Sequence, residues 1–167
     1  VDEIKAAVDA IGRENLMIAH ATSTYPCKLE ELNINCISTL KKMYPDVPIV
    51  IGGIEASLRR VTHYDYWSDK LMPSILVDSK ADFLVYGMGE KPLRELIRQL
   101  WEGKKIGEIT DIPQTSYIAN EIPEVENLQT IELVSHEECL KDKKKYASNF
   151  RYVEEESNRM QGARLVQ

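Results

Sequence analysis

The chain has 167 residues, which is enough for one domain with a hydrophobic core. Its net charge of −6 argues against a nucleic-acid or anionic-membrane surface, and its 43% hydrophobic content argues against disorder. No apolar run reaches the ~18–20 residues that cross a bilayer, so neither nucleic acid nor membrane is expected as a partner.

The first third of the sequence alternates between helical and strand patterns. Apolar residues spaced by three and four predict amphipathic helices, and short continuous apolar runs predict strands buried on both faces. Pro45 ends the second helix because proline cannot continue it. These patterns predict, in chain order, a helix over residues 2–11, a strand over 16–19, a helix over 28–44 and a strand over 48–51.

The rest of the sequence is less regular. An aromatic segment over residues 63–67 lies between two short helical patterns, and the strand that follows them ends in a glycine turn. A serine with a glutamate three residues later predicts the start of a long charged helix near the end. We expect helices over 55–61, 74–80, 92–101 and 135–156, strands over 83–86 and 115–119, a loop over 120–130 and a frayed tail over 157–167.

Strands that alternate with helices predict an α/β fold with a mainly parallel sheet of four, possibly five, strands flanked by helices. We expect residues 1–167 to form a single domain of this kind. So few strands leave the edges of the sheet exposed, which predicts a homodimer that pairs or covers them.

In parallel sheets, ligands gather at the carboxyl ends of the strands. That rule directs attention to the loops 20–27, 52–57 and 87–91. Hydroxyl groups and close glycine backbone there could bind a phosphate-like or nucleotide-like anion; the competing interpretation is turns and helix caps. The candidate anion-binding residues are Ser23, Thr24, Tyr25, Gly52, Gly53, Gly87 and Gly89.

The cysteines and histidines give no metal-binding spacing. Cys27, Cys36 and Cys139 form neither a C-x-x-C pair nor an even disulfide set, and the three histidines are scattered. We therefore expect reduced thiols and a cytoplasmic protein with no metal, no cofactor and no catalytic residue. His20, at a strand end, is interpreted as a structural imidazole.

Residues 14–27 read E-N-L-M-I-A-H-A-T-S-T-Y-P-C. With the helix that follows, this part (residues ~1–49) resembles sialic acid (N-acetylneuraminate) synthases of the NeuB type. Those enzymes are TIM barrels that condense phosphoenolpyruvate with an amino sugar, and the T-S-x-Y-P loop lines their substrate and phosphate site. The resemblance implies that role for positions 22–25. A Gly-Tyr-Ser-x-His segment that supplies a metal ligand in that family is missing here.

From about residue 45 to 167 the chain resembles a different family. The string H-Y-D-Y-W-S-D-K over residues 63–70 is similar to the amino-terminal domain of YgiQ-type radical SAM proteins, whose fold resembles flavodoxin-like cobalamin-binding domains. The C-x-x-x-C-x-x-C loop that holds the iron–sulfur cluster is absent. So is the D-x-H-x-x-G loop of cobalamin-binding domains. The resemblance thus implies neither reaction for this chain.

The two resemblances meet near residues 45–49, and this predicts an engineered chimera without catalytic activity. In that interpretation residues 1–48 derive from a barrel, residues 49–156 are flavodoxin-like, and the fold is a hybrid of the two. One alternative is an anion- or nucleotide-binding module. Another is an N-terminal radical SAM domain that serves for docking or substrate binding, with the segment 63–67 as its docking face. An enzyme fragment with residual condensation activity ranks last.

Overall fold

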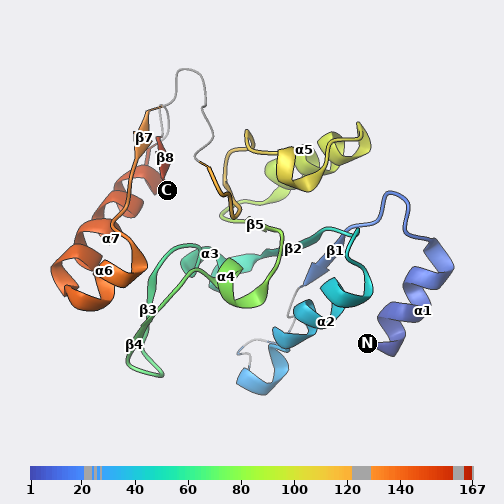
Figure 1. The fold of residues 1–167 in the computed structure, drawn as a ribbon, viewed down its shortest axis with the longest axis horizontal. Helices are drawn as coiled ribbons and strands as arrows, with labels where there is room; N and C mark the ends of the chain where they lie inside the picture. Colours follow the sequence, from blue (N-terminus) through green and yellow to red (C-terminus); the bar gives the residue numbers. More distant parts are fainter. Residues whose placement is uncertain (21–23, 25, 27, 122–128, 160–163, 167) are drawn as a thin grey trace. The chain divides into compact units, whose positions relative to one another are not determined.

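The computed structural model describes residues 1–20, 24, 26, 28–121, 129–159 and 164–166 (Figure 1). The chain divides into two compact units. Unit 1 comprises Val1–Val61 and Ser74–Ala119, and unit 2 comprises Thr62–Pro73 and Asn120–Gln167. The expectation that they behave as one folding domain stays a prediction.

Unit 1 is built on a four-stranded sheet in the order β1-β2-β5-β6. The first three strands are parallel, and β6 runs antiparallel to β5. The α/β fold with a mainly parallel sheet is therefore confirmed. The strands are β1 (Ile18–His20), β2 (Ile49–Gly52), β5 (Phe83–Val85) and β6 (Thr115–Ser116).

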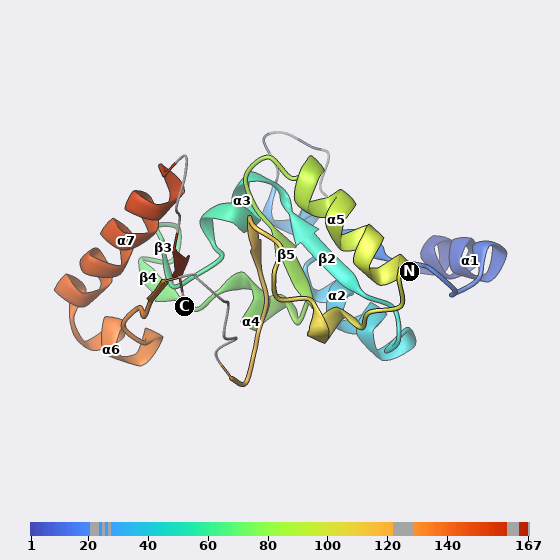
Figure 2. The same ribbon diagram turned by 90° about the horizontal axis from the view of Figure 1, so that it is seen from above.

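Helices cover both faces of this sheet (Figure 2). Successive residues of β2 point to opposite faces, so Ile49 and Ile51 join one core cluster and Val50 joins the other. The first cluster includes Ile37 of α2, and the second includes Leu96 of α5. The helices of unit 1 are α1 (Asp2–Ile11), α2 (Asn35–Met43), α3 (Gly53–Leu58), α4 (Ile75–Ser79) and α5 (Glu90–Trp101), with short 3-10 turns η1 (Leu29–Glu31) and η2 (Ile106–Glu108).

One carboxylate holds the beginnings of two strands against a helix. The Nζ of Lys41 on α2 donates to both oxygens of Asp82, at 2.9 and 2.8 Å. Asp82 Oδ2 also accepts from the backbone N–H of Ile49 at 2.8 Å. The contact fixes the register of β2 and β5, because Asp82 directly precedes β5.

The helix expected over residues 28–44 is interrupted. The structure has η1 and then α2, and Asn33 between them is left-handed with φ 46°. A right-handed helix cannot pass through such a residue, and asparagine is among the few residues that tolerate it. The apolar stripe that predicted the helix continues across this break.

Unit 2 combines a hairpin with two helices. Strands β3 (His63–Asp65) and β4 (Lys70–Met72) pair antiparallel, so the aromatic segment 63–67, for which the sequence predicts no element, begins as a strand. Strands β7 (Thr130–Ile131) and β8 (Leu165–Val166) pair in parallel, so the tail expected to fray contains a paired strand. Helices α6 (His136–Lys141) and α7 (Lys143–Ser157) lie between β7 and β8 in the chain.

The single helix expected over residues 135–156 is two helices. Asp142 separates them with extended backbone angles, φ −143° and ψ 107°, and its side chain accepts from Lys144 N at 2.9 Å as the cap of α7. Asn149 of α7 is buried and bonds both backbone groups of Val134, at 2.9 and 2.7 Å. In the described part of the chain, no helix has the length and apolarity that a membrane span requires.

Candidate functional site: the carboxyl edge of the sheet

The candidate site is the edge of the unit 1 sheet at which β1, β2 and β5 end. Parallel strands bring their carboxyl ends to the same edge of the sheet. The loops 52–57 and 87–91 lie there, and both belong to the residues that the structure describes. In the first loop, 20–27, the candidates Ser23 and Tyr25, like Thr22, lie outside the described residues.

Thr24, the described candidate of the first loop, is engaged by an acidic neighbour. Its hydroxyl donates to Glu31 Oε2 at 2.9 Å, and the same oxygen accepts from Lys28 N at 3.3 Å. A carboxylate at hydrogen-bonding distance repels an anion, so this contact weakens the argument for anion binding at Thr24.

The four candidate glycines lie in the other two loops. Close packing accounts for Gly52 and Gly89, and a left-handed backbone accounts for Gly53 and Gly87. A Cβ on Gly52 would lie 3.1 Å from the carbonyl oxygen of Val85, and a Cβ on Gly89 would lie 3.1 Å from Val85 Cγ1. Gly87 has a φ of 69°, and a Cβ there would meet the movable end of the Gln114 side chain, Nε2, at 2.9 Å. Gly53 has open space around it but a φ of 89°, which other residues rarely adopt.

Ser57 joins the two glycine loops. Its hydroxyl donates to the Gly53 carbonyl at 2.6 Å and accepts from the Gly87 N–H at 3.4 Å. The Arg60 guanidinium donates to the Ser57 carbonyl at 2.6 Å and lies over the Tyr86 ring, 4.7 Å from its centroid. The Ser57 hydroxyl and the Gly87 N–H, two groups that could bind an anion, are thus already bonded within the protein.

Three apolar side chains are exposed at this edge, and we call them the edge patch. Ile54 and Leu58 lie one turn apart on α3, and Met88 belongs to the loop that Ser57 holds. Their exposed fractions are 77%, 65% and 77%. None of the residues of α3 is buried, which is unusual for a helix that carries two large apolar residues.

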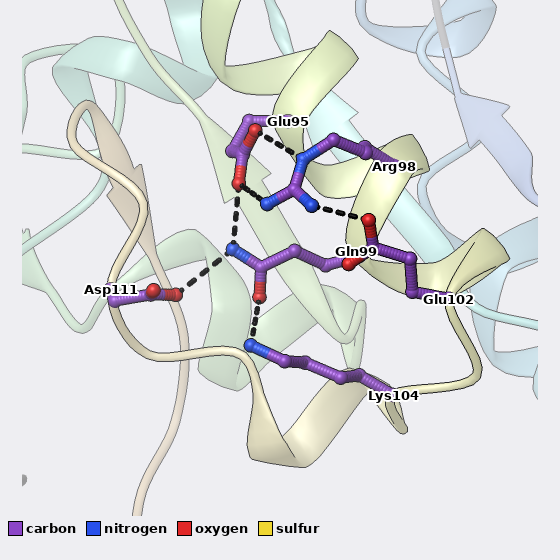
Figure 3. Close-up of polar contacts among 6 residues, drawn as sticks. All are labelled: Glu95, Arg98, Gln99, Glu102, Lys104 and Asp111. Atoms are coloured by element: carbon purple, nitrogen blue, oxygen red, sulfur yellow. Dashed lines mark hydrogen bonds and ion pairs between the residues drawn. The ribbon is translucent and has the colours of Figure 1, made fainter.

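A polar network that the sequence did not reveal fixes helix α5, which follows the edge loop (Figure 3). Gln99 is 2% exposed, and its amide donates to Glu95 Oε1 at 3.0 Å and to Asp111 Oδ1 at 3.1 Å. Lys104 Nζ donates to Gln99 Oε1 at 2.8 Å. The network therefore ties the end of α5 to the segment leading to β6.

Hydrogen bonds in this network also change the pKa of Glu95. Those from Arg98 and then Gln99 lower the pKa of Glu95 to about 2, so it is ionised at neutral pH. Arg98 bridges Glu95 and Glu102 on the solvent side of α5. These are surface pairs that hold a helix rather than groups poised for proton transfer.

The apolar pattern of residues 92–101 predicts that Leu93, Leu96, Ile97, Leu100 and Trp101 face inward, and the structure confirms this only in part. Leu96 is buried, but Ile97 and Trp101 are 42% and 74% exposed, and the buried polar residue Gln99 was not predicted. Among the described residues, no group of three or more His, Cys, Asp or Glu is placed to hold a metal ion. Chemically, the edge patch offers apolar contact area.

Comparison with known proteins gives two overlapping family matches. The family described as "Radical SAM N-terminal" matches residues 30–167, and the NeuB family matches residues 1–53. A UPF0313 protein of Bacteroides thetaiotaomicron is 52% identical over 139 residues, covering 77% of this chain and 22% of the relative. A UPF0313 protein of Porphyromonas gingivalis is 50% identical over 132 residues, covering 77% of this chain and 20% of the relative.

The chain thus spans about a fifth of the length of these curated relatives. No solved structure matches it. The prediction of an engineered chimera is wrong, because bacterial relatives share half of the aligned residues over three quarters of the chain. The radical SAM match also starts at residue 30, so α2 and β2 on the two sides of the supposed junction belong to one natural domain.

Proposed function

Because the chain belongs to the Radical SAM N-terminal family, we propose that it is a docking domain, which packs against the rest of a longer radical SAM polypeptide and carries out no chemistry itself. In this proposal the cluster-binding cysteines and the reacting groups come from the part of the polypeptide outside these residues. A cytoplasmic location and the absence of nucleic-acid and membrane partners stay predictions.

The cysteines of this chain do not fit the cluster that the family name implies. An iron–sulfur cluster that activates S-adenosylmethionine needs three thiolates from one short loop. The sequence has only three cysteines, at positions 27, 36 and 139, and no two of them are closer than nine positions apart. Cys139 is moreover buried in α6, and burial raises the pKa of its thiol, which disfavours the thiolate ligand.

The observation that carries the proposal is the edge patch. Burying a large aliphatic side chain stabilises an association by roughly 1.5–3 kcal/mol, and Ile54, Leu58 and Met88 are all largely exposed. Helix α3 packs its Ala56 against the core of unit 1 and leaves Ile54 and Leu58 exposed, so these two side chains become buried only when another surface covers them. The relatives are about five times longer than the matched segment, so such a surface is available in the same polypeptide.

The test uses a hybrid protein, in which the matched segment of the Bacteroides relative is exchanged for this chain. Hydroxyl-radical footprinting then compares the oxidation of Met88 in the hybrid and in the 167-residue chain alone. We expect Met88 to be oxidised several-fold more slowly in the hybrid, together with slower hydrogen exchange of the α3 amides. Trp101, exposed on α5, provides the internal reference.

A matched variant separates docking from folding. I54S/M88S is expected to leave the melting temperature of the isolated chain nearly unchanged, because both side chains are exposed. In the hybrid it should restore fast exchange of the α3 amides. Equal Met88 oxidation in the hybrid and in the isolated chain would refute docking at this edge.

Anion or nucleotide binding at the glycine loops stays a prediction, and so does substrate binding at the same edge. Calorimetric titration of the chain with inorganic phosphate and with phosphoenolpyruvate tests the anion site. The contacts of Ser57 and Thr24 favour the docking role over this second one.

A further inference from the structure

We propose that the β3–β4 hairpin of unit 2 is a second, aromatic docking surface for the rest of the same polypeptide. This inference rests on the proposed function, but on a surface separate from the edge patch. We define the aromatic surface as Tyr64, Tyr66 and Trp67, three large side chains within four consecutive positions.

These side chains are exposed to a degree that the isolated fold does not explain. Tyr64, Tyr66 and Trp67 are 49%, 65% and 72% exposed. The rings of Tyr66 and Trp67 lie against each other, with centroids 4.6 Å apart. Tryptophan and tyrosine are the residues that most often dominate the binding energy of protein interfaces, because they bury large areas with few rotatable bonds.

The turn that carries the pair is held by its own side chains. Asp65 Oδ2 accepts from the Ser68 hydroxyl at 2.6 Å and from the Ser68 N–H at 3.3 Å. The Tyr64 hydroxyl donates to Asp69 Oδ1 at 2.7 Å, and the backbone of Asp69 is left-handed. A fixed turn loses little conformational entropy on binding, which favours a docking surface over a loosely attached loop.

Two contacts attach the hairpin to the helices of unit 2. The Tyr64 N–H donates to the Tyr146 hydroxyl on α7 at 3.1 Å. Thr62 Oγ1 and His136 Nδ1 of α6 are hydrogen-bonded at 3.2 Å. Phe150 lies one turn beyond Tyr146 on α7 and is 58% exposed, so it extends apolar area along that helix.

The occupant is the remainder of the longer polypeptide. The matched segment is only 22% and 20% of the first two relatives, which leaves most of each chain available to cover this surface. A covalently attached partner needs few contacts to stay docked, because attachment raises its effective concentration to the millimolar range. A preformed aromatic pair satisfies that modest requirement.

The hybrid described above tests this inference independently of the edge patch. We expect oxidation of Tyr66 and Trp67 to be several-fold slower in the hybrid than in the isolated chain, with Trp101 again as the reference. Protection of Met88 without protection of Trp67 would overturn the aromatic surface and leave the edge intact. Protection of Trp67 alone would overturn docking at the edge.

A second measurement needs only the 167-residue chain. The variant Y66S/W67S should shift its melting temperature by less than about 2 °C, since both side chains are exposed. A much larger loss would show that the rings support the fold of unit 2, and the inference would fail. It would also fail if Trp67 became protected as the isolated chain is concentrated, because the occupant would then be a second copy.

Discussion

Gln99 shows that one residue can contribute to the stability of a helix although the spacing of apolar residues does not reveal it. Glutamine at this position reads as one polar residue on an amphipathic helix, yet its amide is buried and has three partners from two segments. Sequence periodicity predicts α5 but not this contact, because the partners Lys104 and Asp111 lie beyond the helix.

Replacing Gln99 by alanine should lower the free energy of unfolding by about 1–3 kcal/mol, because three hydrogen bonds and buried volume are lost. Chemical denaturation monitored by circular dichroism measures the change. Arg98→Gln is the matched control, since its exposed ion pairs contribute at most about 1 kcal/mol. Equal losses in both variants would contradict the role given to Gln99.

Glu156 provides a prediction about pH. The guanidinium of Arg164, and then its backbone N–H, hold the pKa of Glu156 below its ordinary value. A lowered folded pKa contributes stability that is present above the unfolded value of about 4.3 and is lost as the pH falls through the folded pKa. Glu156→Gln should therefore be less stable than the parent at neutral pH, and the difference should shrink in acid.

The measurement is the melting temperature of both proteins between neutral pH and roughly pH 3. Glu155→Gln is the control, because Glu155 forms an exposed pair with Arg151, at 3.6 Å. A constant difference across this range would mean that the ion pair is not the source of the stability.

At the scale of elements, parallel strands and their helices were predictable, and breaks within helices were not. The buried runs before Gly52 and before Tyr86 predicted β2 and β5, because three-residue stretches of Val, Ile, Leu and Phe suit strands buried on both faces. The break at Asn33 and the hairpin turn through Asp69 depend on left-handed residues, which periodicity does not register. The exposure of the edge patch was not predicted either, because apolar spacing does not show which side chains the rest of the fold leaves uncovered.

The break at Asp142 leads to a prediction about α7. Asp142→Ala removes the cap that accepts from Lys144 N, and should cost about 1 kcal/mol. Asp142→Asn should retain most of this stability, because an amide oxygen also caps. Comparison of the two variants by thermal unfolding distinguishes loss of the cap from loss of the charge.

At the scale of the whole molecule, one thiol in each unit allows the opening of unit 1 and the opening of unit 2 to be followed separately. In a Cys27→Ser background, Cys36 reports on unit 1 and Cys139 on unit 2. Cys139 is fully buried with a raised pKa, whereas Cys36 is half-buried, so an aromatic disulfide reagent should label Cys139 at least about tenfold more slowly at neutral pH. Similar labelling rates would show that unit 2 opens readily.

The pairing of β8 with β7 has a consequence for how this protein is degraded. A proteolytic cut between α7 and β8 would detach the partner strand of Thr130–Ile131 and the Arg164 guanidinium that pairs with Glu156. Unit 2 would lose the ladder between β7 and β8, and Glu156 would keep its pair with Arg159, at 3.2 Å. The resistance of unit 2 to further proteolysis would thus depend on whether β8 stays joined to α7.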